Sequence, residues 1–220
     1  MPSDHALAGT ARSTVRRKRE RGSHDRTLIR DILDEGLVCH VGFVADHGPV
    51  VLPMAYVRID DDLYIHGAAG NDMLGHLASG TDVCVTVTLL DGLVFARSAF
   101  HHSMNYRCVV LFGTAARVTD HNEMHAVAAG LLDHLAPGRS ADARAPSDDE
   151  LRATMIVRLP ITEGSAKVRT GGPIEEPEDL DRPVWAGQLP VEFCARAPVA
   201  DAGREEMDVP PYITNHGLRR

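Results

Sequence analysis

The chain has 220 residues, of which 44% are hydrophobic and 25% are charged, and its formal net charge is −8. This composition is typical of a globular protein with one core, and the acidic balance argues against a surface built for nucleic acid or anionic lipid, because phosphate binding needs a basic face. The most apolar stretch, residues 83–96, contains polar residues and is shorter than the roughly 18 residues that span a bilayer, so no membrane segment is predicted.

Cysteine usage and the N-terminal residues indicate a cellular compartment. The four cysteines are widely spaced and form no C-x-x-C pair, which is typical of reduced thiols that pack as small apolar side chains. The basic cluster at 16–21 is followed by charged residues and not by the apolar segment of a signal peptide. The sequence therefore predicts a cytoplasmic protein.

The first quarter of the chain alternates between polar and periodic segments. Residues 1–24 are rich in Ser, Arg and His and are expected to form a flexible basic arm. Asp25 is the predicted N-cap of an amphipathic helix, and Gly36 is predicted to follow its end in the C′ position. Turn residues rich in Asp and Gly then separate three predicted strands, 37–45, 49–59 and 63–67.

The rest of the chain continues this alternation. Helices are predicted at 71–80, at 124–135 after a capping-box pattern of Asp120 and Glu123, and in a short turn after a similar pattern of Ser147 and Glu150. Asp91-Gly92 predicts a hairpin turn. Further strands are predicted at 83–89, 93–96, 106–118 and 154–161, with an apolar segment at 184–193. The domain is predicted to span 25–195, and 196–220 to form a loose C-terminal tail.

The order of these elements predicts the fold class. Consecutive strands are joined by short connections without crossover helices, which favours an antiparallel barrel, mainly β with flanking helices, over a parallel α/β sheet. No G-x-G-x-x-G or P-loop pattern occurs, so a Rossmann or P-loop mechanism is poorly supported.

One stretch between two predicted strands is unusually rich in polar side chains. Residues 97–107 contain two arginines together with His102, Ser103, Asn105 and Tyr106. Arginine binds phosphate through a planar fork and Ser or Asn can complete the set of donors, so the stretch is a candidate anion-binding rim, with Arg107 as its best-placed cation. The alternative is a polar loop held by its own turns.

Other residues suggest cofactor chemistry less specifically. His40, His66 and the pair His101-His102 invite a metal or haem interpretation, but adjacent histidines on an extended chain point to opposite faces and no carboxylate completes a metal site. Lys167 and Arg169 share one face of a predicted strand and face either phosphate or solvent. Trp185, the only tryptophan, could cover an aromatic cofactor or pack in the core.

The sequence resembles a known family over about residues 15–195. The segments "LYIHG", "HHSMNYRCVVLFGTA" and "SAKVRTGGP…VWAG", in this order, are similar to those of the pyridoxamine 5′-phosphate oxidase-related flavin-nucleotide-binding family, and most of all to its nitroimidazole-reductase-like branch. The resemblance implies a six-stranded antiparallel FMN-binding split β-barrel. It also implies a homodimer with FMN at the subunit interface.

The same resemblance implies a set of cofactor contacts. His66 and Gly67 are expected beside the flavin ring, flanked by Pro53 and Met54, and Asn71 and Met73 are expected near the phosphate. The contacts along the cofactor would come from residues of the later segments, namely His102, Ser103, Asn105, Tyr106, Arg107, Lys167 and Trp185. Relatives often have Lys or Arg where Met73 stands, which leaves more of the phosphate charge to Arg107 or Lys167, or favours FAD.

Three functions follow from these expectations. The first is a flavin-dependent oxidoreductase acting on a small molecule, in which the cofactor supplies the chemistry and His66 or Tyr106 donates a proton. The second is a flavin carrier or sensor without catalysis. The third is a haem-binding split barrel that uses one of the histidines.

Overall fold

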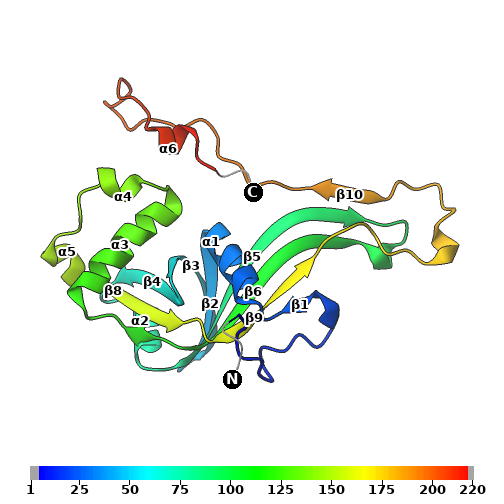
Figure 1. Cartoon of the computed structure of the whole chain (residues 1–220), viewed down its shortest axis with the longest axis horizontal. Helices are drawn as coiled ribbons and strands as arrows, with labels where there is room; N and C mark the ends of the chain where they lie inside the picture. The colour runs from blue at the N-terminus through cyan, green and yellow to red at the C-terminus, as the bar shows by residue number, and fades with distance from the viewer. Residues whose placement is uncertain (1–4, 218–220) are drawn as a thin grey trace.

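The computed structural model describes residues 5–217, and Figure 1 shows their arrangement around one large sheet. Ten strands of the described chain form this sheet, and every pair of neighbouring strands is antiparallel. The strands are β1 (Gly22–Ser23), β2 (Val38–Ala45), β3 (Gly48–Ile59), β4 (Asp62–Ala68), β5 (Asp82–Phe95), β6 (Ser103–Thr114), β7 (Ala116–Arg117), β8 (Thr154–Pro160), β9 (Glu163–Arg169) and β10 (Gly187–Pro190).

The order of the strands is β1-β9-β6-β5-β2-β3-β4-β8-β7, with β10 paired to β5, and the described residues do not close this path into a ring. The mainly β, antiparallel class is confirmed, whereas the predicted count of six strands is corrected to ten. The additional strands include β1 and β7, which have only two residues each, and β10. Strands this short show no clear alternation of polar and apolar residues. They form because they pair with strands that are distant in the sequence.

Six α-helices flank the sheet in the described chain. They are α1 (Arg26–Glu35), α2 (Asp72–Ala78), α3 (His121–Leu135), α4 (Arg139–Asp142), α5 (Asp148–Arg152) and α6 (Pro211–Thr214), and 3₁₀ turns form at Arg19–Arg21, Ala99–His101 and Pro177–Asp179. The predicted N-caps are confirmed: the Asp25 carboxylate accepts from the Leu28 amide at 2.8 Å, and the Asp120 carboxylate accepts from the Glu123 amide at 2.8 Å. Ser147 and Glu150 form a reciprocal capping box.

The main core lies on the inner face of the curved sheet. Alternate residues of the strands, among them Val41, Val85 and Leu111, are almost completely buried. α1 contributes three buried residues from one helical face, and α2 contributes Met73, Leu74 and Leu77. α3 covers the opposite face of β3, β4 and β8, where Val127 packs in a second apolar cluster.

β5 and β6 continue past the rest of the sheet as a long two-stranded arm, with β10 alongside (Figure 1). The predicted turn at Asp91-Gly92 is therefore wrong: β5 runs without a break through these residues, and its register with β6 shifts between Leu90 and Gly92. A Cβ on Gly92 would lie 3.0 Å from the Leu189 carbonyl of β10. The glycine thus marks a close approach of backbones and not a hairpin turn.

Both terminal segments make specific contacts. In the segment predicted to be a flexible basic arm, Leu7 is 4% exposed and the Arg12 guanidinium donates to Glu163 at 2.9 and 2.7 Å. In the predicted loose tail, the Tyr212 hydroxyl of α6 donates to Asp142 at 2.5 Å, which ties the tail to α4. No helix in residues 5–217 is long and apolar enough to cross a membrane.

Candidate functional site

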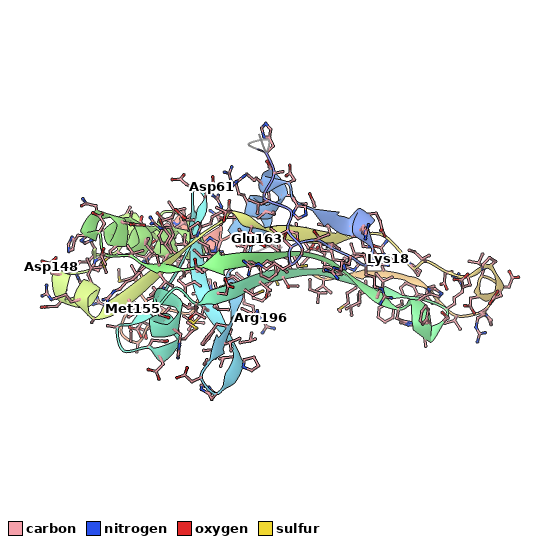
Figure 2. The ribbon with its side chains drawn as sticks, turned by 90° about the horizontal axis from the view of Figure 1, so that it is seen from below. Lys18, Asp61, Asp148, Met155, Glu163 and Arg196 are labelled. Carbon is pink, nitrogen blue, oxygen red and sulfur yellow. The ribbon has the colours of Figure 1, made fainter. Side chains whose placement is uncertain are left out.

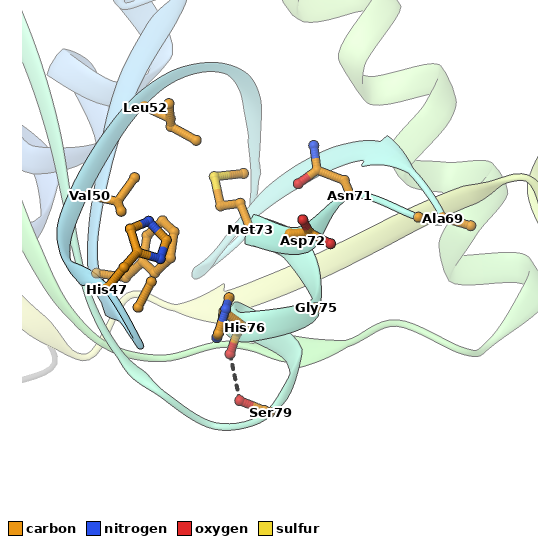
Figure 3. A pocket seen from close by; sticks show the side chains of 13 residues that line it. His47, Val50, Leu52, Ala69, Asn71, Asp72, Met73, Gly75, His76 and Ser79 are labelled. Atoms are coloured by element: carbon orange, nitrogen blue, oxygen red, sulfur yellow. Dashed lines mark hydrogen bonds between the residues drawn. The ribbon is translucent and has the colours of Figure 1, made fainter.

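A groove lies between the β2–β3 turn and α2, with a volume of about 720 Å³ (Figure 3). Its lining is mostly small or apolar and comprises Phe43, Ala45, His47, Val50, Leu52, Ala69, Gly70, Asn71, Asp72, Met73, Gly75, His76 and Ser79. Gly67 of β4 lets α2 approach the strand closely, because a Cβ at this position would lie 3.0 Å from Leu74. A planar ring can approach the backbone in such a groove.

The groove is poor in positive charge. No lysine or arginine is among its lining residues, and Asp72 is exposed at the start of α2. The Asn71 side chain accepts from the Leu74 amide at 3.2 Å and so caps α2, while Met73 is 4% exposed and packs into the core. The cation that the family resemblance led us to expect at position 73 is therefore not replaced by another lining residue of this groove.

A second cavity, of about 380 Å³, lies on the other face of β4 between that strand and α3. It is lined by Ala55, Tyr56, His66, Ala128, Leu131, Leu132, Leu135, Arg144, Pro146, Glu150, Leu151, Thr154 and Ile156. His66 is the only histidine of this lining. Its Nδ1 is buried and has no hydrogen-bond partner among the described residues. Burial lowers the pKa of His66, so its ring is held in the neutral form that ligates metals.

Part of the predicted polar rim lies at the far end of the β5–β6 arm, away from α2 and α3 (Figure 1). The His102 ring nitrogen Nδ1 lies 3.0 Å from the Ser98 carbonyl, and the ring stacks edge-on against Phe95 with centroids 5.9 Å apart. The ring centroids of Trp185 and Phe95 lie 6.0 Å apart, and the Trp185 side chain is 68% exposed. His102 and Trp185 therefore come together on the arm, but not at either cavity.

Arg107 is held between two carboxylates. Its guanidinium donates to Asp91 at 2.7 and 3.0 Å and to both oxygens of Glu35, the last residue of α1. These bonds use nearly all of its donors, and the two acids would repel a phosphate. Arg107 is thus paired with two acids within the protein, beside an apolar cavity of about 420 Å³.

A separate polar chain crosses β9, β6 and β10. The Arg169 guanidinium donates to the Asn105 side-chain oxygen, and the Asn105 amide donates to Gln188 at 2.8 Å. Tyr106 lies opposite Arg169, and Lys167 lies opposite Cys108. Sequence reasoning did not include Arg169 among the site residues, although its shared strand face with Lys167 was the signal for it.

The predicted site residues thus fall into three places in the chain's fold. Asn71 and Met73 line the groove, His66 lines the second cavity, and the residues of the later segments lie on the arm and its neighbouring strands. Pro53 is exposed on β3, and Met54 packs against the core. The described residues contain no cluster of three or more His, Cys, Asp or Glu side chains suited to a metal ion.

Comparisons with known proteins give a consistent result. The family described as pyridoxamine 5′-phosphate oxidase matches residues 25–168. The flavocytochrome Anf3 from Azotobacter vinelandii is 33% identical, with a TM-score of 0.88 over 94% of this chain and 97% of that one. An FAD and haem binding protein from Mycobacterium smegmatis is 35% identical, with a TM-score of 0.85 over 90% of this chain and 97% of that one.

A more distant structure shares the fold alone. A candidate 5-nitroimidazole antibiotic resistance protein from Bacteroides thetaiotaomicron is 23% identical, with a TM-score of 0.57 over 67% of this chain and 86% of that one. No curated protein sequence matches the chain.

Proposed function

The chain belongs to the pyridoxamine 5′-phosphate oxidase family, and from this premise we propose that it is a flavin-nucleotide-binding redox protein that acts on a small molecule. The observation that carries the proposal is the groove at α2, which combines a volume of about 720 Å³ with small and apolar lining residues and a strand-to-helix turn. Such a concave, mostly apolar site suits a planar cofactor ring.

Within this proposal the groove residues have defined tasks. Val50 and Leu52 give apolar surface for the ring, and the small residues Ala69 and Gly70 leave space beside it. When bound, a flavin supplies hydride and electron transfer, and the protein supplies position and exclusion of water. A carrier or sensor would use the same contacts, so a turnover measurement is needed to distinguish an oxidoreductase from either of them.

We favour FAD over FMN. The Mycobacterium smegmatis protein, 35% identical over 90% of this chain, is described as binding FAD and haem. The groove lining has no lysine or arginine, so the phosphate of either nucleotide is expected to lie beyond these residues. Chromatography of the flavin released by heat distinguishes the two nucleotides.

We propose haem as a second cofactor, with His66 as the iron ligand. The fit rests on the cavity between β4 and α3: it is lined mostly by apolar side chains, and the buried Nδ1 of His66 has no partner among the described residues. Neutral imidazole is a common haem ligand, and the exposed Arg144 lies at the rim, where it donates to Glu150 at 2.7 and 2.9 Å. This assignment replaces the predicted role of His66 as a proton donor. A Soret band in the purified protein tests it.

We further propose that the protein is a cytoplasmic homodimer. Support for a dimer comes from the outer face of β2 and β3, where Val38, Val44 and Val51 are 51%, 67% and 64% exposed and are followed by Pro53 and Ala55. An apolar sheet face of this kind is typical of a two-fold interface. The four free cysteines support a reducing compartment.

Turnover is the experiment that separates an oxidoreductase from a carrier. The flavin-loaded protein, reduced with dithionite under argon, is mixed with candidate small-molecule acceptors, and reoxidation is followed by the flavin absorbance. An oxidoreductase reoxidises faster with one acceptor class than with buffer alone. Identical rates with all acceptors, including oxygen, would favour the carrier or sensor.

A further inference from the structure

The N-terminal basic cluster is an unusual feature of an acidic protein. Residues 16–21 hold five cations and one acid, Glu20, in a chain of net charge −8. The cations before Arg21 are exposed, and Figure 2 shows Lys18 at the surface beside the strands. The one ion pair within the cluster is weak, because Arg21 Nε lies 3.9 Å from an exposed Glu20 oxygen.

The fold joins this cluster to two further cations. β1 begins directly after Arg21 and pairs with β9, so that Gly22 lies opposite Lys167. Lys167 and Arg169 are two residues apart on β9 and share one face of it. The pairing of β1 with the end of β9 therefore brings Arg21 near Lys167 and Arg169, although Arg21 lies more than 140 residues before them in the sequence.

Arg169 is the most deeply buried arginine of the described chain, with 5% exposed. Its hydrogen bonds go only to neutral oxygens, those of Asn105 and the carbonyls of Gly171 and Gly172 at 3.0 Å. Three other partly buried arginines have an acidic partner: Arg58, Arg97 and Arg107 each pair with a carboxylate. Within residues 5–217, Arg169 is thus a buried cation without a counter-ion.

The surroundings make this arrangement electrostatically unfavourable unless an anion is present. Burial and the positive charge of Arg21 both lower the pKa of Arg169. Buried charges in proteins are normally paired, because hydrogen bonds to neutral oxygens leave part of the desolvation cost uncompensated. An anion placed among the three cations would remove that cost.

We propose that Arg169, Lys167 and Arg21 form a binding site for a phosphate group. Guanidinium groups present planar pairs of donors that match phosphate oxygens, and lysine adds a mobile charge. Asn105 and the glycine carbonyls hold the Arg169 side chain in place before any ligand arrives. The phosphate belongs either to the flavin nucleotide, in which case the inference rests on the proposed function, or to a second phosphorylated ligand.

The test is calorimetric titration of inorganic pyrophosphate into two forms of the full chain, one stripped of flavin by dialysis against concentrated bromide and one saturated with FAD. We expect saturable binding to the stripped form. Arg169→Gln should weaken it at least about tenfold, and Arg21→Gln and Lys167→Gln should weaken it less, because each removes one charge-assisted contact. Binding that disappears on FAD saturation identifies the flavin phosphate as the natural occupant, and binding that persists identifies a second ligand.

A matched control separates a built site from general charge. Arg152→Gln removes the same charge from an exposed arginine of α5 that is paired with Asp149, and it should leave pyrophosphate affinity unchanged. The two surface variants at positions 21 and 167 decide the outcome should Arg169→Gln fail to fold. Absence of saturable binding to the stripped protein, or equal losses in Arg152→Gln and the site variants, overturns the proposal. Neither result depends on whether flavin binds, so failure of this site and failure of the flavin proposal are distinguishable.

Discussion

His66 and Arg107 occupy opposite kinds of environment, although both were expected to contact one cofactor. Arg107 is bonded to two carboxylates, which raise the pKa of its guanidinium further. His66 faces an apolar cavity and its Nδ1 has no partner among the described residues. The first residue is therefore satisfied within the chain, and the second is available to a ligand.

His66→Ala should abolish haem binding and leave the fold intact, because the side chain lines a cavity and makes no hydrogen bond through Nδ1. Haemin titration followed by the Soret band measures this. His76→Ala, which changes a histidine of the other groove, should bind haem like the wild type. Equal haem affinity in His66→Ala and the wild type would remove His66 as the ligand.

Arg107→Ala should destabilise the fold by about 1–3 kcal/mol, because it leaves Glu35 and Asp91 facing each other without their shared cation. Urea unfolding measures the loss, and a second change, Glu35→Gln, should restore part of it. FMN and riboflavin affinities should change equally. A loss confined to FMN, with unchanged stability, would instead show that Arg107 binds the phosphate.

The chemically unusual residues could be predicted from the sequence, but their partners could not. Glu35 precedes Arg107 by 72 residues, and their contact depends on where α1 ends against the sheet. Likewise, the pairing of Arg169 with Asn105 joins residues 64 apart through the β6–β9 register. Local patterns identify such side chains, whereas only the assembled sheet shows which are compensated.

The end of α1 at Gly36 was predicted correctly, but the physical reason for the glycine differs from the expected one. The helix ends where predicted, but Gly36 has φ −73° and ψ 142°, so it does not adopt the left-handed conformation expected at C′. A Cβ there would lie 2.4 Å from Val87 and 2.7 Å from the Tyr56 hydroxyl. A glycine is required here because α1 lies too close to the sheet for a larger residue. The caps at Asp25 and Asp120 could be predicted because each bonds an amide only three residues away.

Gly36→Ala should therefore destabilise the protein by about 1–3 kcal/mol through overpacking. Gly75→Ala is the matched control, because nothing lies within 4 Å of its added Cβ and α2 gains a better helix former. Thermal unfolding of both variants gives the comparison. A Gly36→Ala protein as stable as Gly75→Ala would show that α1 can move away from Val87 without cost.

The arm was not predictable from local pattern. Asp91-Gly92 has the composition of a hairpin turn, yet β10, almost 100 residues later, passes over Gly92 and keeps the strand extended. The meander of β2, β3 and β4 was predictable because its strands are joined by short turns.

At the scale of the whole molecule, the exposed apolar face of β2 and β3 should be the dimer interface. Val51→Lys should weaken dimerisation at least about tenfold, because it buries an unpaired charge. Analytical ultracentrifugation across micromolar concentrations measures the association. Val199→Lys, at a tail residue that is 94% exposed, should associate like the wild type. A wild-type protein that stays at 23.9 kDa throughout would exclude this dimer.

The most direct test of the account is the flavin content of the purified chain. The protein is heated, the precipitate is removed, and the supernatant is separated by chromatography against FAD, FMN and riboflavin standards. We predict stoichiometric release of a flavin nucleotide, with FAD as the main species. A supernatant without flavin, combined with no quenching of FAD or FMN fluorescence when either is titrated into the intact protein, would contradict the assignment.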